Sequence, residues 1–363
     1  MTPSIHLLLQ GPRGRRLCLE LAMELYQEIR AAVFWLAYEL DNGRGTSRVL
    51  LSAVSSESVQ AKPPTPSLEW LAARLRSSDF TDLKESQLQA ALERSVDSAR
   101  YWQPPDGEDV LAGLPEVAQA LSPVAEQFIA SPRMQWCWQP RQVEQWAIDW
   151  RHTDDPALLP KNPGKTLTEW ARKECAEEVT AARERPSDPT ANVSGTWWSI
   201  PHGLIQTVGQ LPAGLSLVED SLGWEHATTV PVRASGKVLE INTAEDWINL
   251  CRKFPLEVTA SRRHDWFHTT GRHGRWVIPD WEKVAGEWDA THLTVIGYLS
   301  AAGLPLEVDF ETATVIAGWD PDSTIWLTDV VREWIGPRQQ WQRDSNRDPW
   351  IGNNQDSGRD VRY

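Results

Sequence analysis

The sequence predicts an α+β protein in which a helical N-terminal domain is followed by a tryptophan-rich, mixed α+β C-terminal domain. Apolar residues recur at helical spacing through most of the first half of the chain. After Gly195, short β-like runs separated by turn residues take over. More than half of the 21 tryptophans lie between Trp197 and Trp334. This density indicates a compact aromatic core, or a surface that stacks on a flat ligand, because each ring buries about 150–250 Å².

The first domain is expected to span residues 1–186 and to be helical. Its first helix is predicted at 12–40, and the Asp-Asn-Gly sequence at 41–43 is a typical stop signal. Ser67 has a side chain of the type that caps a helix N-terminus. The further helices are predicted at 67–75, 81–96, 114–130, 140–150 and 167–184. These apolar helix faces are expected to pack into a core that belongs to the first domain alone.

The second domain is predicted to span residues 195–335, after a linker at 187–194 where prolines and turn formers end the helical pattern. The β-like runs are expected at 196–200, 215–218, 227–232, 237–241, 292–296 and 314–317. The helices that interrupt them are expected at 244–253, 281–287 and 324–334. This alternation favours an antiparallel or mixed sheet.

Two polar segments lie near the C-terminus. Asp320, Asp322 and Ser323 place several oxygens close together, but a calcium loop needs more ligands and a glycine at the bend. We therefore expect Asp322 or Ser323 to cap the helix at 324–334. The segment 336–363 is rich in Arg, Asp, Asn and Gln, and it is predicted to be a disordered tail.

Charge and cysteine content restrict the class of protein. The formal net charge of −14 opposes broad nucleic-acid binding, which needs a basic surface, and it opposes attachment to an anionic membrane. The four cysteines are widely spaced and include no CxxC pair, so free thiols are expected. No apolar stretch reaches the roughly 20 residues that a bilayer span needs. These features predict a cytoplasmic protein.

A basic cluster interrupts the acidic composition. Arg262 and Arg263 precede His264 and His268, and such a group could hold a phosphate. The two histidines are four residues apart, which suits metal ligation on a helix. However, the Thr-Thr-Gly sequence at 269–271 favours a loop or a strand, so no metal site is predicted. A phosphate-binding or general-acid role and an ordinary hydrogen-bonded role both stay open for the histidines.

The start of the second domain and its acidic stretch carry the other candidate residues. Trp197 and Trp198 are adjacent on a predicted strand, so they should point to opposite faces, one buried and one free to stack on a planar ligand. The stretch 280–289 contains Glu287 among several carboxylates. It is either an acid–base site desolvated by indoles or a helix with a solvated acidic face.

Several motifs spread along the chain resemble a set of uncharacterised actinobacterial proteins of unknown activity. In the second part, the motifs are the runs at 195–201, 218–220, 261–266, 277–281, 288–294, 297–299 and 318–322. In the first part, they are the runs at 11–18 and 101–104. The resemblance covers nearly the whole chain and implies a common fold.

The second domain is also similar to ADP-ribosyltransferase folds in its strand order. The similarity lies in the Trp-Trp-Ser run at 197–199, then 237–241, then 288–292. It implies an NAD site in a cleft between two small sheets, with Ser199 as the second-strand residue and Glu287 or Glu307 as the late glutamate. His264, from the basic cluster, is the further catalytic candidate, in a general-acid role.

Two functional classes follow from these observations. The first is a non-catalytic cytoplasmic binding or scaffold protein, with a protein partner on its helical domain and structural tryptophans. The alternative is an ADP-ribosyltransferase-like enzyme that uses NAD in its C-terminal domain, or a protein that takes a similar nucleotide-like ligand. In this alternative, Ser199, Glu287 and His264 are the catalytic residues. Its ligand-binding residues are Trp197, Trp198, Arg262, Arg263 and His268.

Overall fold

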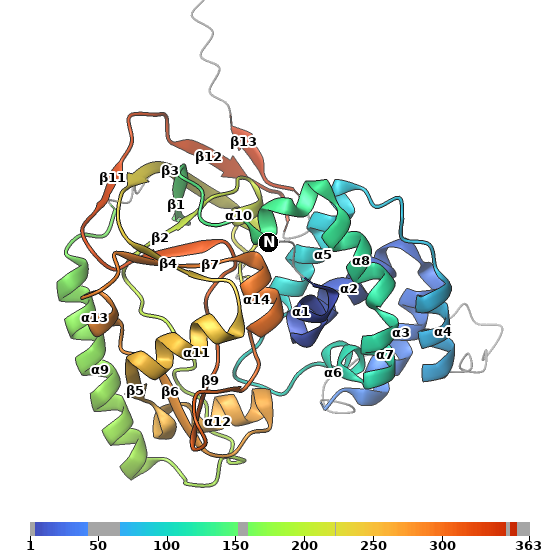
Figure 1. The fold of residues 1–363 in the computed structure, drawn as a ribbon, viewed down its shortest axis with the longest axis horizontal. Helices are drawn as coiled ribbons and strands as arrows, with labels where there is room; N and C mark the ends of the chain where they lie inside the picture. The colour runs from blue at the N-terminus through green and yellow to red at the C-terminus, as the bar shows by residue number, and fades with distance from the viewer. Residues whose placement is uncertain (1–3, 43–65, 152–158, 222, 346–348, 354–363) are drawn as a thin grey trace, which may run out of the picture.

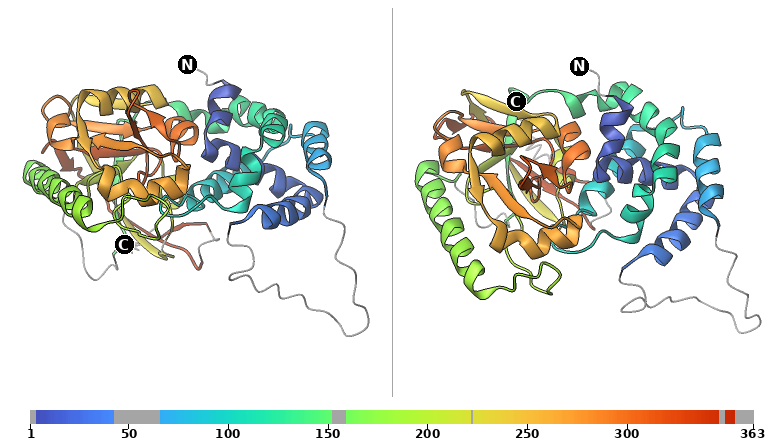
Figure 2. Two further views of the ribbon diagram at one scale, coloured as in Figure 1. Left: turned by 90° about the horizontal axis from the view of Figure 1, so that it is seen from below. Right: turned by 60° about the horizontal axis from the view of Figure 1, so that its bottom comes forward.

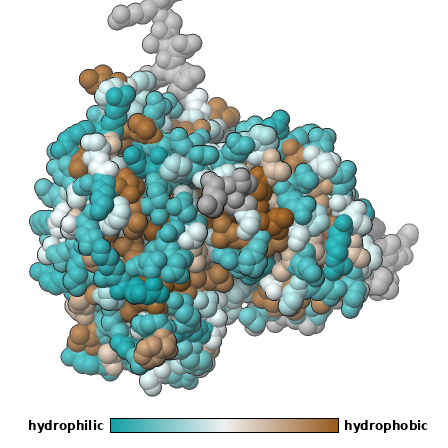
Figure 3. Space-filling model, viewed as in Figure 1, coloured by the Kyte–Doolittle hydropathy of each residue, from teal (hydrophilic) through white to brown (hydrophobic). Residues whose placement is uncertain are grey.

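The computed structural model describes residues 4–42, 66–151, 159–221, 223–345 and 349–353. A part made of helices lies beside a part that contains two sheets, and this arrangement is plain in all three ribbon views (Figure 1, Figure 2). The expected α+β class is therefore confirmed. Hydrophilic residues predominate on the face shown in Figure 3, in keeping with the acidic composition. Among the described helices, none has the length and apolarity needed to cross a bilayer.

The helical part is built from short helices. Their bounds are α1 (Ile5–Gln10), α2 (Pro12–Leu25), α3 (Gln27–Leu40), α4 (Leu68–Ser77), α5 (Glu85–Asp97), α6 (Gly107–Gly113), α7 (Pro115–Ala120), α8 (Ser122–Ala130) and the 3-10 helix η1 (Pro132–Trp138). The single helix predicted at 12–40 is wrong, because the chain turns at Tyr26 between α2 and α3. Tyr26 has extended φ and ψ angles of −126° and 107°, although its N–H still donates to the carbonyl of Ala22.

The larger sheet has nine strands. Their bounds are β1 (Gln145–Asp149), β2 (Ile205–Val208), β3 (His226–Ala234), β4 (Val238–Ile241), β7 (Ala290–Leu293), β10 (Ser323–Trp326), β11 (Val331–Glu333), β12 (Gln339–Gln342) and β13 (Ile351–Asn353). The order is β13-β12-β3-β1-β2-β10-β7-β4, with β11 also paired to β3. Its pairs are antiparallel except β4 with β7, so the predicted mixed sheet is confirmed.

Three predictions of local structure in this region are wrong. The helix expected at 140–150 contains β1, which lies between β2 and β3 and bonds to both. The helix expected at 324–334 is instead β10 and β11; all four residues of β10 are buried between β2 and β7. The tail expected at 336–363 contributes β12 and β13, because β12 pairs with β3. In each case, ladder partners distant in sequence outweigh local preference. Residues 354–363 lie outside the described part of the chain.

A smaller four-stranded sheet completes the second part. It consists of β5 (Pro255–Glu257), β6 (Arg275–Pro279), β9 (Thr312–Thr314) and β8 (Leu306–Glu307), in that order. The helices of the second part are α9 (Pro163–Glu184), α10 (Ala213–Ser216), α11 (Ala244–Lys253), α12 (Thr259–Thr270), α13 (Trp281–Val284) and α14 (Val295–Ala301). Helix α9 lies on the side of this part that faces away from the helical part (Figure 1).

The two parts share one hydrophobic core, so the prediction that the helices pack a core of their own is wrong. One cluster of buried side chains extends from Leu8 in α1 to Leu327 after β10. Helix α14 makes the connection, because all of its residues are buried and it contacts α1, α2 and η1. The approach is close: a Cβ atom on Gly11 would lie 2.1 Å from the carbonyl oxygen of Leu299.

The tryptophans of the second part form a buried aromatic core. Those with fully buried side chains are Trp247, Trp266, Trp276, Trp281, Trp319 and Trp326. Most of their indole N–H groups have partners, as buried donors require; for example, Trp247 donates to Thr314 Oγ1 at 3.1 Å. Trp281, Trp247 and Trp319 contact one another, with ring centroids 5.9–6.1 Å apart. The compact aromatic core expected from the composition is therefore present.

Gly318 provides a test of how tightly this aromatic region is packed. Its φ of 70° favours glycine, and an added Cβ would lie 2.2 Å from Cδ1 of Trp198. Gly271 has a similar φ of 71° but no neighbour within 4 Å of an added Cβ. A substitution at Gly271 therefore measures the cost of backbone strain without overcrowding. We expect Gly271→Ala to lower the free energy of unfolding by about 1 kcal/mol, and Gly318→Ala by about 3 kcal/mol because overcrowding adds to strain. Urea denaturation measures both; equal losses would contradict the tight indole contact.

Candidate functional site

The predicted catalytic residue Ser199 is part of the structural core. No strand forms at 196–200; the segment is extended and lies against the loop after β9. The buried Ser199 Oγ donates to the carbonyl of Ala317 and accepts from its N–H, both at 3.0 Å. The carbonyl of Ser199 accepts from the indole of Trp281. This hydroxyl therefore fastens two segments together, and both of its hydrogen-bonding roles are used.

Trp197 and Trp198 stack on each other, with ring centroids 4.6 Å apart. They do not point to opposite faces, because the strand that would alternate them is absent. Trp102 from the helical part lies 4.9 Å from Trp197. These half-buried rings form an aromatic stack between the two parts of the molecule.

The predicted phosphate-binding arginines have protein partners. The guanidinium of Arg262 is buried and donates to Glu174 of α9 at 2.6 Å and to the carbonyl of Trp198 at 3.3 Å. Burial raises the pKa of Glu174, although Arg262 opposes this shift. Arg263 donates to the carbonyl of Ser187. Arg262 therefore attaches α12 to α9 through an ion pair of low exposure.

The predicted histidines lie on a helix rather than on a loop or strand. Helix α12 continues to Thr270 and ends at Gly271, so His264 and His268 do stand one turn apart. His264 is buried, and its pKa is lowered by burial and by the neighbouring Arg263. Within the described residues, His, Cys, Asp and Glu form no group of three or more suited to a metal ion.

The structure joins some of the predicted site residues and separates others. Contacts link Trp198 with Arg262 and Trp197 with Trp198. Glu287 instead pairs with Lys253 of α11 at the surface. Among the described residues, Glu287 makes no hydrogen bond or ion pair with Ser199 or His264.

A buried histidine outside the predicted set lies between two carboxylates. His292 of β7 has Nδ1 2.5 Å from Glu240 Oε2 and Nε2 3.4 Å from Asp322 Oδ1. Burial lowers its pKa, but the two carboxylates outweigh burial and raise it above the ordinary value. Asp322 also accepts from the N–H groups of Gly209 and Gln210, both at 3.1 Å. The imidazole thus connects β4, β7 and the turn before β10.

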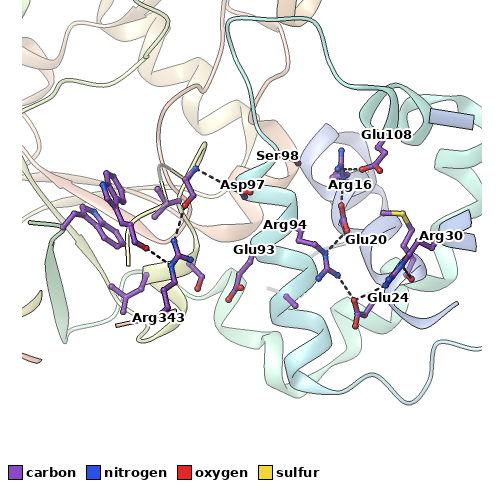
Figure 4. A pocket seen from close by; sticks show the side chains of 18 residues that line it. Arg16, Glu20, Glu24, Arg30, Glu93, Arg94, Asp97, Ser98, Glu108 and Arg343 are labelled. Carbon is purple, nitrogen blue, oxygen red and sulfur yellow. Dashed lines mark hydrogen bonds and ion pairs between the residues drawn. The ribbon is translucent and has the colours of Figure 1, made fainter. Parts of the chain in front are cut away.

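A cavity lies where the helical part meets the larger sheet (Figure 4). Its volume is about 720 Å³. None of the site residues predicted from the sequence lines it. The lining residues are Arg16, Glu20, Met23, Glu24, Arg30, Ala90, Glu93, Arg94, Asp97, Ser98, Glu108, Trp150, Leu215, Ser216, Val218, Ser221, Trp224 and Arg343. They come from segments more than 300 residues apart in sequence, so the cavity exists only in the folded chain.

On the helical side of the cavity, ion pairs form a continuous chain. Arg16 Nε donates to Glu20 Oε1 at 2.9 Å, and Arg94 Nε donates to Glu20 Oε2 at 2.8 Å. Arg94 Nη2 continues to Glu24 at 3.2 Å, and Glu24 lies 3.5 Å from Arg30. Figure 4 shows these side chains, which come from α2, α3 and α5, pointing toward one another. Mutual pairing holds them in place and reduces the flexibility of long side chains.

The sheet side of the cavity combines indoles with polar groups. The rings of Trp150 and Trp224 stack with centroids 4.6 Å apart. Arg343 Nε donates to the carbonyl of Trp224 at 2.7 Å. Asp97 of α5 accepts from the N–H of Ser221 at 3.0 Å, so this side is attached directly to the helical part.

A buried acid lies behind the loop that lines the cavity. Between the lining residues Val218 and Ser221, Glu219 turns inward and accepts a hydrogen bond from the hydroxyl of Tyr101. Its N–H donates to Asp320 Oδ1 at 2.9 Å. Burial raises the pKa of Glu219 to about 8 and that of Asp320 to about 6. Burial therefore favours the protonated, neutral form of Glu219.

The sequence contains only weak signals of this site. Glu20 and Glu24, and likewise Glu93 and Asp97, are spaced by one helical turn and so share a helix face. Such spacing is common on solvated surfaces. The partners that make these residues a cavity lining, such as Arg343, are far away in the chain.

Comparisons with protein-family models, curated proteins and solved structures give no match to this chain. The chemical interpretation therefore depends on the geometry of the site. Charged groups of both signs, hydroxyls and indoles converge on a space large enough for a small molecule. Such a lining can fix the orientation of a polar ligand through hydrogen bonds and contacts with flat rings.

The raised pKa of Glu219 predicts a specific dependence of stability on pH. In the unfolded chain, the carboxyl of Glu219 regains its ordinary pKa. From about pH 4.5 to 8, the unfolded chain therefore binds fewer protons than the folded chain. The free energy of unfolding should fall across this range. Glu219→Gln mimics the neutral acid, so its stability relative to wild type should improve by about 3 kcal/mol between pH 5 and pH 8.

Denaturant unfolding at several pH values measures this effect. Glu116→Gln on the exposed face of α7 removes the same charge and should leave the pH profile unchanged. Parallel profiles for wild type and Glu219→Gln would show that Glu219 is ionised in the folded protein.

Proposed function

We propose that this chain is a binding protein that takes up a small polar molecule in the cavity between its helical part and its larger sheet. The observation that carries the proposal is the cavity itself, with a volume of about 720 Å³ and a lining of charged side chains, hydroxyls and indoles. Small-molecule sites typically have volumes of about 300–1,000 Å³ and a few placed polar groups.

The lining side chains are held in fixed positions, and this supports a binding function. Arg16, Glu20 and Arg94 are fixed by one another, and Arg16 is only 6% exposed. A ligand that meets side chains already held in place pays less entropy on binding. The lining is therefore organised before any ligand arrives.

The chemistry of the lining favours binding over catalysis. Among the described residues that line the cavity, the polar groups are arginines, carboxylates and serines, without a histidine or a cysteine. Histidine is the commonest general base, and cysteine is an intrinsically strong nucleophile. The protein partner expected from the sequence stays a separate prediction.

A cavity-filling variant tests the proposal. We expect at least one of three probes, agmatine, glutarate or adenosine monophosphate, to raise the unfolding free energy of the wild type, by about 2.7 kcal/mol at 100 times its Kd. Ser216→Phe places a ring in the cavity and should abolish this stabilisation, whereas Ser77→Phe on the exposed end of α4 should not. Thermal unfolding with each probe is the measurement. Stabilisation that survives in Ser216→Phe, or none with any probe, counts against the cavity.

Incubation with NAD distinguishes this proposal from the ADP-ribosyltransferase-like enzyme that the resemblance implies. A binding protein incubated with millimolar NAD should release no nicotinamide above a protein-free blank, as measured by chromatography. Release that is lost in Glu287→Gln but retained in Glu282→Gln would contradict the proposal and favour the NAD-using alternative. Glu282 is a matched control because it lies on the same short stretch of chain.

A further inference from the structure

The arginines that line the cavity are already engaged by the protein. Arg16 and Arg94 share Glu20, and Arg94 also donates to Glu24. Arg343 donates to the carbonyl of Trp224 and to Ser221 Oγ. Arginine recognises an anion best when its planar edge is free to form two parallel hydrogen bonds. The lining is therefore poorly suited to an anionic ligand.

Carboxylates are in excess around the same space. The lining contains five carboxyl groups and four guanidinium groups. Arg16 also pairs with Asp106 and Asp109 outside the lining, which uses more of its positive charge. Within the described residues, Glu93 and Asp97 form no ion pair. They lie one turn apart on α5, between the Arg343 side and the Arg94 side of the cavity (Figure 4).

The local environment makes two of the lining carboxylates, Glu93 and Glu108, costly to ionise. Burial raises the pKa of Glu93, even though Arg343 and Arg94 oppose the shift. Burial also raises the pKa of Glu108; its partner Arg16 opposes this shift, and Glu20 and Asp106 add to it. For Glu93 and Glu108, the nearby arginines do not offset the cost of burial, and a cation from solution would reduce this cost.

The non-ionic part of the lining has complementary chemistry. The faces of indole rings attract organic cations within about 6 Å of the ring centre, and Trp150 and Trp224 line the sheet side of the cavity. Ser98, Ser216 and Ser221 add hydroxyl oxygens that can accept from N–H groups. Carboxylates, indoles and hydroxyls together are the set that an ammonium or guanidinium group requires.

We infer that the ligand of this cavity is a small organic cation. Its ammonium or guanidinium group lies at Glu93 and Asp97, and its carbon chain lies against Trp150 and Trp224. The inference rests on the proposed function, because it names the ligand class of the same cavity. It excludes anions and uncharged polyols of similar length as preferred ligands.

Calorimetric titration with three probes of similar length tests the inference: agmatine as the cation, glutarate as the anion and pentanediol as the uncharged probe. We expect agmatine to bind most tightly and to weaken as salt is raised. Glu93→Gln and Asp97→Asn should each weaken agmatine at least tenfold. Both changes keep an oxygen acceptor. In Asp97→Asn, the Ser221 N–H therefore retains its partner. Glu85→Gln removes the same charge from the start of α5, outside the lining, and should leave binding unchanged.

The pH dependence gives a second readout. Because only ionised Glu93 attracts the cation, agmatine affinity should rise from acid to neutral pH in the wild type, and this rise should shrink in Glu93→Gln. Agmatine that binds Glu93→Gln and Asp97→Asn as well as wild type overturns the site assignment. Glutarate or pentanediol binding in preference to agmatine overturns the cation class, while the proposed binding function stands. If no probe binds, and adenosine monophosphate also fails to stabilise the protein, both proposals fall.

Discussion

The burial of helix α14 between the helices and the sheets is the constraint on which the rest of the structure depends. All of its residues are buried, and it contacts α1 and α2 on one side and α11 on the other. The backbone at Gly11 approaches Leu299 so closely that no side chain would fit between them. One core therefore extends through both parts. The apolar area removed from water at this junction holds the two parts in a fixed relation, and the cavity can keep its shape.

Polar groups at the junction follow from the same packing. Where the helices and the larger sheet meet, side chains such as Arg16 and Glu20 are covered and must find partners within the protein. The protein meets this requirement in two ways: it pairs charges along α2 and α5, and burial beneath the 218–221 loop favours the neutral form of Glu219. Glu93 and Asp97 are left without an ion pair among the described residues, and these two carboxylates give the cavity its proposed preference for a cation.

The candidate residues chosen from the sequence have mainly structural roles in the described contacts. Ser199 fastens two segments, and Arg262 connects α12 to α9 through Glu174. The sequence placed the tryptophans, the serine and the arginine in the second part, and the structure brings Trp198 and Arg262 into contact. Residue type alone does not show that the hydroxyl of Ser199 uses both of its hydrogen-bonding roles on the backbone of Ala317, because that partner is distant in sequence. The sequence does not predict the cavity, because its carboxylates have the spacing of an ordinary solvated helix face.

The sequence by itself determined the α+β class, the helical first part and the aromatic core, because hydrophobic periodicity and tryptophan content act locally. It also located β3, β4 and α11 closely. Only the tertiary structure decided that 145–149 and 323–326 are strands, since their hydrogen-bond partners come from far along the chain. The same is true of the cavity. Its lining from Arg16 to Arg343 is assembled by packing, and no local pattern encodes a contact between such distant segments.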